Sequence, residues 1–324
     1  MSRLPDGESE HEPGHSARDD LRAHVQAARA DIERQFESTR AQFDQAQEKI
    51  QERTGRNLIL ATLIGLVLGF SMLFSLIVVK ELFMAFAAVL IVFSTWELTQ
   101  ALRKAAYDVP RIPVLVAAVG TLPLGYYFGP TGLLAGVLGG VVLVAIWRLA
   151  SQALPGRSDS RGLARDLGAG VFVILYIVCL GGFSVVLTAE DGGQWWTLAF
   201  LILAIVADTG AYAAGLSFGK HKMAPIISPK KTWEGFAGGG LACMIAGVLL
   251  AIFLLEQEWW HGLVLGIAIF LTATLGDLAE SLIKRDLGIK DMSSWLPGHG
   301  GFLDRLDSIL PSAAVAYAAF LVFT

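Results

Sequence analysis

A group of carboxylates lies inside or at the ends of long apolar stretches, where an ionised group is costly unless it pairs, faces water or has a function. Asp277 and Glu280 are three residues apart in TLGDLAESLIK, so a helix would present both on one face. Asp304 and Asp307 have the same spacing in FLDRLDS, and Asp208 lies within AIVADTGAY. Carboxylates from separate helices suit Mg²⁺, a hard cation that also binds substrate phosphates. The pattern favours a magnesium site, and the alternative for each acid is a salt bridge, a hydrogen bond or a helix cap.

A basic segment, ISPKKTWEGF, follows the apolar stretch that contains Asp208. Its Ser-Pro pair predicts a turn, after which Lys230, Lys231 and Thr232 lead into Glu234 and a glycine-rich helix start. Backbone N–H groups at a helix N-terminus act together with ammonium groups in holding phosphate. We therefore interpret this segment as a phosphate cradle, with ordinary lysine contacts to lipid headgroups as the alternative.

A second basic segment, IKRDLGIKD, contains Lys284, Arg285 and Lys290. It leads into LPGHGGFLDRLDS, in which three glycines and His299 precede Arg305. Glycines let a backbone approach a ligand closely, while lysine and arginine neutralise the charge of a polyphosphate. Acids, bases and glycine-rich turns together favour metal-assisted phosphoryl or nucleotidyl transfer.

The composition indicates that a membrane positions these residues. Hydrophobic residues make up 54% of the 324 residues and charged residues only 17%, whereas a soluble domain carries about 25% charged residues. A helix needs about 20 apolar residues to cross the hydrocarbon core. We predict a hydrophilic tail, partly helical or disordered, at residues 1–57 and a transmembrane catalytic domain at 58–324. The domain should be an all-α polytopic bundle of about nine transmembrane helices, at 58–79, 82–99, 112–128, 131–149, 167–188, 196–216, 236–255, 261–283 and 307–323.

The distribution of Lys and Arg predicts the orientation. These residues concentrate after the second, fourth, sixth and eighth apolar segments, while the opposite turns are poor in them. Because cytoplasmic loops carry the excess of positive charge, the N-terminal tail and the four basic loops should be cytoplasmic. An odd number of spans then leaves the C-terminus outside. We expect a multi-pass protein of the cell membrane with its active site facing the cytoplasm.

Residues 281–308, SLIKRDLGIKDMSSWLPGHGGFLDRLDS, closely resemble the signature of bacterial phosphatidate cytidylyltransferases, also called CDP-diglyceride synthases. The segments ISPKKTWEGF and DTGAYAAGLSFGKHK also look like segments of that family, in the expected order. The resemblance implies that CTP and phosphatidic acid react to CDP-diacylglycerol and pyrophosphate. It also implies dependence on Mg²⁺, with K⁺ as a candidate second cation, and a homodimer would be a reasonable expectation for the family. Membrane lipid is a further expected partner, and nucleic acid is not.

The resemblance also implies roles for single residues. The metal-binding acids of the family map onto Asp277 and Asp304, and Asp307 and Glu280 are further candidate ligands. The catalytic set would be completed by Lys284, Arg285 and Arg305. The substrate-binding set would comprise Ser228, Lys230, Lys231, Thr232, Glu234, Asp208, Lys290, His299, Gly300 and Gly301.

Two other classes of protein compete with this prediction. A cation-coupled transporter also places acids inside spans, but it should have polar groups on both sides of the midplane and an internal repeat. Here the polar residues gather on one side. Another CTP-using lipid kinase or transferase is harder to separate by physical argument, and only the long signature speaks against it.

Overall fold

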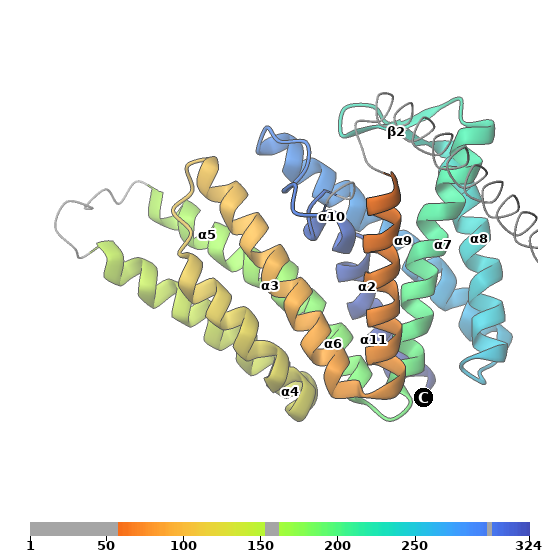
Figure 1. Ribbon diagram of the computed structural model, residues 1–324, viewed down its shortest axis with the longest axis horizontal. Coiled ribbons are helices and arrows are strands. Elements are labelled where there is room, and N and C mark those ends of the chain that lie inside the picture. Colours follow the sequence, from red (N-terminus) through yellow and green to blue (C-terminus); the bar gives the residue numbers. More distant parts are fainter. Residues whose placement is uncertain (1–57, 153–161, 297–299) are drawn as a thin grey trace, which may run out of the picture. The chain divides into compact units, whose positions relative to one another are not determined.

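The computed structural model describes residues 58–152, 162–296 and 300–324, and its helices are shown in Figure 1. Seven helices in these ranges are long and apolar enough to cross a membrane. The predicted class, an all-α polytopic membrane protein, is thereby confirmed. The number of nine crossings and the orientation of the termini stay predictions, and the predicted tail at 1–57 lies outside the described residues. The account below concerns the compact unit Ala61–Thr324.

The described helices and strands follow one another in chain order. They are α2 (Leu58–Val78), α3 (Lys80–Lys104), α4 (Arg111–Gln152), α5 (Leu163–Val173), the π-helical η2 (Ile174–Cys179), α6 (Leu180–Ala189), α7 (Gly193–Phe218), β1 (Lys222–Ala224), β2 (Ser228–Thr232), α8 (Trp233–Phe253), α9 (Trp259–Asp286), α10 (Leu303–Leu306) and α11 (Ile309–Phe323).

Helix α4 is a helical hairpin. Gly129 has φ 61° and ψ −148°, which breaks the helix, and Pro130 cannot donate to the preceding turn. Beyond the break the two arms lie against each other, since a Cβ at Gly136 would meet the Cα of Thr121 at 2.8 Å. The two arms are visible in Figure 1. The break at Gly129 lies between the predicted spans 112–128 and 131–149.

The core of the bundle surrounds the continuous helical segment Leu163–Ala189. Its middle is buried completely at Ile174, Ile177 and Val185, and it packs against α3, α4 and α11. A segment apolar on all sides is expected where a helix is surrounded by other helices. This half of the molecule is therefore a closely packed scaffold.

Helices α7, α8 and α9 form the other half, in which small residues bring the backbones close together. A Cβ at Gly247 of α8 would lie 2.2 Å from the carbonyl oxygen of Gly262 in α9, so only glycine fits there. Such contacts between small residues are typical of helix packing in membranes. The close approach fixes α8 against α9 and thereby places the ends of these helices next to the β1–β2 hairpin.

Candidate active site

A cavity of about 360 Å³ opens between α7, α8, α9 and the β1–β2 hairpin. Its apolar wall includes Phe236 and Phe270, and its polar wall brings two acids together with two lysines. The residues that line it are Ala207, Asp208, Ala211, Tyr212, Met223, Lys230, Lys231, Thr232, Gly235, Phe236, Phe270, Thr274 and Asp277. Five of the residues predicted from the sequence therefore share one cavity.

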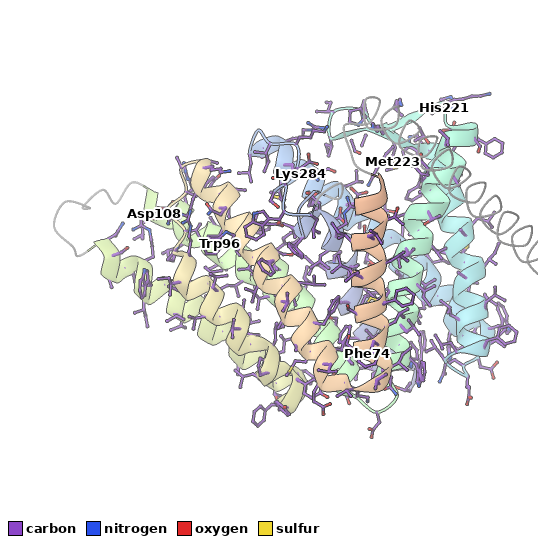
Figure 2. All side chains as sticks on the ribbon, viewed as in Figure 1. Phe74, Trp96, Asp108, His221, Met223 and Lys284 are labelled. Carbon is purple, nitrogen blue, oxygen red and sulfur yellow. The ribbon has the colours of Figure 1, made fainter. Side chains whose placement is uncertain are left out.

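The β1–β2 hairpin holds the two lysines over this cavity. Its strands are antiparallel, with Lys222 opposite Thr232, and the Thr232 hydroxyl accepts a hydrogen bond from the Gly235 N–H at 3.1 Å. Thr232 thus caps α8 at the glycine-rich helix start that was predicted from the sequence. Glu234, a predicted substrate residue, accepts from His221 Nδ1 at 2.6 Å and from the Lys220 N–H at 3.1 Å. In this structure Glu234 closes the turn that precedes the hairpin (His221 is labelled in Figure 2).

An ion pair joins the hairpin to α9. Lys231 Nζ lies 2.6 Å from Asp277 Oδ2, and the two side chains are 22% and 30% exposed. Asp208 of α7 and Asp307, just after α10, are close enough to Asp277 to repel it electrostatically. Lys231 and Arg305 oppose that repulsion at Asp208. Three helical elements thus present mutually repelling carboxylates, and cations from the chain reduce the repulsion.

A second group of charges lies deeper, beside the loop that follows α9. Lys284 Nζ donates to Asp304 Oδ1 at 3.0 Å and also forms an ion pair with Glu280, which is fully buried. Asp304 accepts in addition from the Gly301 N–H at 2.7 Å and the Met292 N–H at 3.2 Å. Only 6% of the Asp304 side chain is exposed. Asp304, as placed here, holds the loop in shape.

Gly300 and Gly301, shortly before α10, lie beside carboxylates. Gly300 has φ +83°, a backbone conformation that favours glycine, and its backbone pairs with Leu296 at 2.9 and 3.1 Å. A Cβ at Gly301 would lie 2.7 Å from Glu97 Oε2. Both glycines are therefore required by the fold, and their contact with substrate phosphate stays a prediction. His299 lies outside the described residues.

Glu97 of α3 holds this loop through its carboxylate, and it was not among the site residues predicted from the sequence. It is 2% exposed and accepts hydrogen bonds from the N–H groups of Phe302 at 3.0 Å and Leu303 at 2.9 Å. The Ser293 hydroxyl donates to the same carboxylate at 2.5 Å. A signal was present, since Glu97 is an acid inside the predicted span 82–99, and such an acid is expected to have a function.

The remaining predicted residues surround these two groups. Arg285 Nε donates to the Ile227 carbonyl at 3.3 Å and so ties the end of α9 to the hairpin loop. Ser228 begins β2 and is half-buried, while Lys290 and Arg305 are exposed. Lys284 is labelled in Figure 2, at the end of α9. The structure thus gathers the predicted residues at one end of the bundle without joining all of them in one cavity.

The donor set fits Mg²⁺ in kind. Within the described ranges, no three His, Cys, Asp or Glu side chains form a complete metal site. Mg²⁺ is commonly bound through one or two carboxylates, with water and substrate phosphates as further ligands. Asp277, with Asp208 and Asp307 nearby, supplies such a partial set of oxygen ligands beside two lysines.

The fold and the cavity define a class, a polytopic membrane protein whose acids and lysines meet at the cavity between α7, α8 and α9. The sequence model described as the cytidylyltransferase family matches residues 59–323. A phosphatidate cytidylyltransferase of Mycobacterium bovis is 42% identical over 271 residues, which cover 82% of this chain and 89% of the relative.

Two further relatives are also described as phosphatidate cytidylyltransferases. That of Mycobacterium leprae is 39% identical over 275 residues, covering 82% of this chain and 88% of its own length. That of Haemophilus influenzae is 39% identical over 136 residues, covering 40% and 46%. The chain belongs to the cytidylyltransferase family and is a nucleotidyltransferase of the multi-pass membrane type.

Proposed function

We propose that the protein is a phosphatidate cytidylyltransferase, which converts CTP and phosphatidic acid into CDP-diacylglycerol and pyrophosphate. The observation that carries the proposal is the meeting of Lys230 and Lys231 with Asp208 and Asp277 in one cavity. The names of the relatives support the choice of substrates. Family membership favours this enzyme over a cation-coupled transporter.

The reaction needs positioning and charge neutralisation more than covalent help from the protein. An oxygen of the phosphatidate phosphate would attack the α-phosphorus of CTP and form the new P–O bond. The bond from the α-phosphorus to the bridging oxygen would break, and pyrophosphate would leave. A phosphate monoester is largely ionised at pH 7, so no strong general base is required.

The residues of the chain have separate tasks in this proposal. Lys230 and Lys231 would bind the phosphates of CTP, since ammonium groups offset their charge. Asp277 and Asp304 would hold Mg²⁺, with Asp307 and Glu280 as further candidates. When bound, Mg²⁺ would polarise phosphoryl oxygens and offset the developing charge.

The pair of Lys231 and Asp277 brings together a group that would bind phosphate and a group that would bind metal. The ammonium group lies against the carboxylate at 2.6 Å. In the proposed reaction Asp277 would hold Mg²⁺ and Lys231 would hold a phosphate of CTP. Asp304 accepts N–H and ammonium donors at both oxygens. The Met292 N–H is shared between the same two oxygens, so a metal held by Asp304 would take the place of one of these donors.

The side of the membrane and the assembly also belong to the proposal. In the proposal the cavity faces the cytoplasm, as the distribution of Lys and Arg predicts; soluble CTP would enter from water and phosphatidic acid from the bilayer. K⁺ as a second cation and a homodimer stay predictions.

The test is an assay of the purified full-length protein with labelled CTP, phosphatidic acid and Mg²⁺. We expect labelled CDP-diacylglycerol and one pyrophosphate per turnover. Replacing phosphatidic acid by diacylglycerol distinguishes a CTP-using lipid kinase, which would release CDP and make phosphatidic acid. Release of CDP from CTP when diacylglycerol is the lipid supplied, or no lipid product from phosphatidic acid, would refute the proposed reaction.

A further inference from the structure

A second polar cavity, of about 230 Å³, lies beside the C-terminal end of α3. The start of the first arm of α4 and the end of its second arm complete the lining. It shares no lining residue with the catalytic cavity. Asp108, in its wall, and Met223, in the wall of the catalytic cavity, lie at opposite sides of the view in Figure 2. The two cavities are therefore separate places on the molecule.

Three guanidinium groups line this second cavity, those of Arg103, Arg111 and Arg148. Arg148 is the most buried of them, with 8% of its side chain exposed, and its Nη2 lies 2.8 Å from Asp166 Oδ2. Asp108 lies 3.6 Å from both Arg148 and Arg103. Two carboxylates thus oppose three guanidinium groups, and the cavity keeps an excess of positive charge.

The excess charge is associated with Arg111. Among the described residues, the partners of Arg111 are neutral: Nη2 donates to Gln100 Oε1 at 2.6 Å, and the guanidinium lies over the Trp96 ring at 5.5 Å. The Nε–H groups of Arg111 and Arg148 are buried and have no hydrogen-bond partner among the described residues. A buried donor without a partner is unfavourable, so an acceptor that reaches these groups is favoured. Guanidinium forks match the geometry of phosphate oxygens.

The mouth of the cavity is apolar. Ile112 and Trp147 both line it, and they are 62% and 47% exposed. They belong to α4, one of the helices apolar enough to span the membrane, and tryptophan is enriched at the membrane–water interface. A ligand that fits here carries a phosphate at one end and hydrocarbon at the other.

We propose that this cavity binds the phosphate group of an anionic phospholipid from the surrounding bilayer, with Arg111 as the main contact and the acyl chains beside Ile112 and Trp147. The site differs from the proposed catalytic cavity in its residues and its helices. Its occupation does not depend on the transfer reaction, so failure of one proposal leaves the other standing.

The test measures binding of dioleoylphosphatidylglycerol, an anionic phospholipid that is neither substrate nor product of the proposed reaction. The full-length protein in phosphatidylcholine micelles is titrated with this lipid, and bound lipid is counted by native mass spectrometry. Arg111→Gln should weaken the tightest binding step about tenfold. The control is Lys104→Gln, which removes one charge at the end of α3, close to the cavity in sequence but outside its lining. It should change binding less than about twofold, because a single surface charge contributes less than a guanidinium fork on phosphate.

Two further variants keep the test decisive. Arg111→Lys retains the charge but loses the fork, and an intermediate affinity is expected. Arg103→Gln serves if Arg111→Gln does not fold, which the thermal unfolding midpoint reports. Equal losses in Arg111→Gln and Lys104→Gln would show general surface attraction and overturn the proposal. Unchanged affinity in both arginine variants would also overturn it.

A parallel titration with inorganic phosphate separates a lipid site from a site for free phosphate. We expect phosphate at millimolar concentration to leave the bound phosphatidylglycerol in place, because it lacks the acyl chains. Complete displacement by phosphate would contradict the assignment to a lipid.

Discussion

Asp277 and Asp304 were predicted as a pair from the sequence, yet they lie in different surroundings. Asp277 lines the cavity, is 30% exposed, and pairs with a lysine from another element. Asp304 is 6% exposed and receives hydrogen bonds from two backbone N–H groups and Lys284. A carboxylate that pairs with one movable lysine is suited to exchange its partner for a cation. A carboxylate fixed by backbone donors keeps a loop in shape, so the two acids should respond differently to the same substitution.

The largest effect is expected for Asp277→Asn. The amide has no charge to attract a cation, so the rate of CDP-diacylglycerol formation should fall by about 100-fold or more. The thermal unfolding midpoint should change little, because Asp277 is partly exposed and its ion pair contributes little to stability. The matched control is Asp191→Asn, an exposed acid in the turn between α6 and α7, which should leave both quantities unchanged. A large fall in the midpoint for Asp277→Asn would contradict the assignment to the cavity.

Asp304→Asn should lower both activity and stability. The amide nitrogen would face the N–H groups of Gly301 and Met292 and leave the half-buried Lys284 with one carboxylate fewer. The free energy of unfolding should fall by about 2 kcal/mol, and activity by about 100-fold if Asp304 also holds metal. Chemical denaturation and limited proteolysis of the loop near Trp295 measure the structural part. Stability equal to that of the wild type would show that Asp304 does not hold the loop.

Glu97→Gln tests whether the conformation of the loop before α10 affects the activity, besides the candidate metal ligands themselves. Glutamine has one acceptor oxygen for the N–H groups of Phe302 and Leu303 and puts an NH₂ group near them. We expect a fall in kcat of about tenfold, a KM for CTP within about twofold, and a loss of about 1–2 kcal/mol in stability. Glu97→Asp retains the charge and should restore part of kcat. A change confined to KM would place Glu97 in substrate binding and refute a positioning role.

Lys231→Gln should have the smallest effect of the four. The KM for CTP should rise about fivefold with kcat changed less, because Lys230 remains as a second phosphate contact. Steady-state kinetics at low and moderate salt measure this effect. Lys220→Gln, an exposed lysine that does not line the cavity, is the control. Equal effects of the two substitutions would indicate a general attraction of CTP by surface charge.

The sequence predicted the features that depend on local pattern. Apolar length predicted the long helices, and the spans 112–128 and 131–149 predicted separate helices on either side of Gly129. The lysine loop and the acid of α9 were also predicted to belong to one site, and they share the cavity. These predictions succeed because charge inside apolar sequence is costly and therefore informative.

The features that the sequence did not predict depend on contacts between distant residues. Glu97 lies more than 200 residues before the residues whose N–H groups donate hydrogen bonds to it. No rule of sequence spacing links residues so far apart. The glycines of the loop were interpreted as room for phosphate, but Gly301 is needed because Glu97 fills the space beside it. The different surroundings of Asp277 and Asp304 likewise depend on distant contacts, since Glu97 of α3 holds the N–H groups of Phe302 and Leu303 beside Asp304.

The most direct test of the claim that the cavity between α7, α8 and α9 is the active site is a Mg²⁺ titration of CDP-diacylglycerol formation. Wild type and Asp277→Asn are compared at saturating CTP and phosphatidic acid. We predict that the substitution raises the Mg²⁺ concentration for half-maximal rate by about tenfold or more, besides lowering the maximum. An unchanged Mg²⁺ dependence in Asp277→Asn would contradict the claim and place the metal elsewhere.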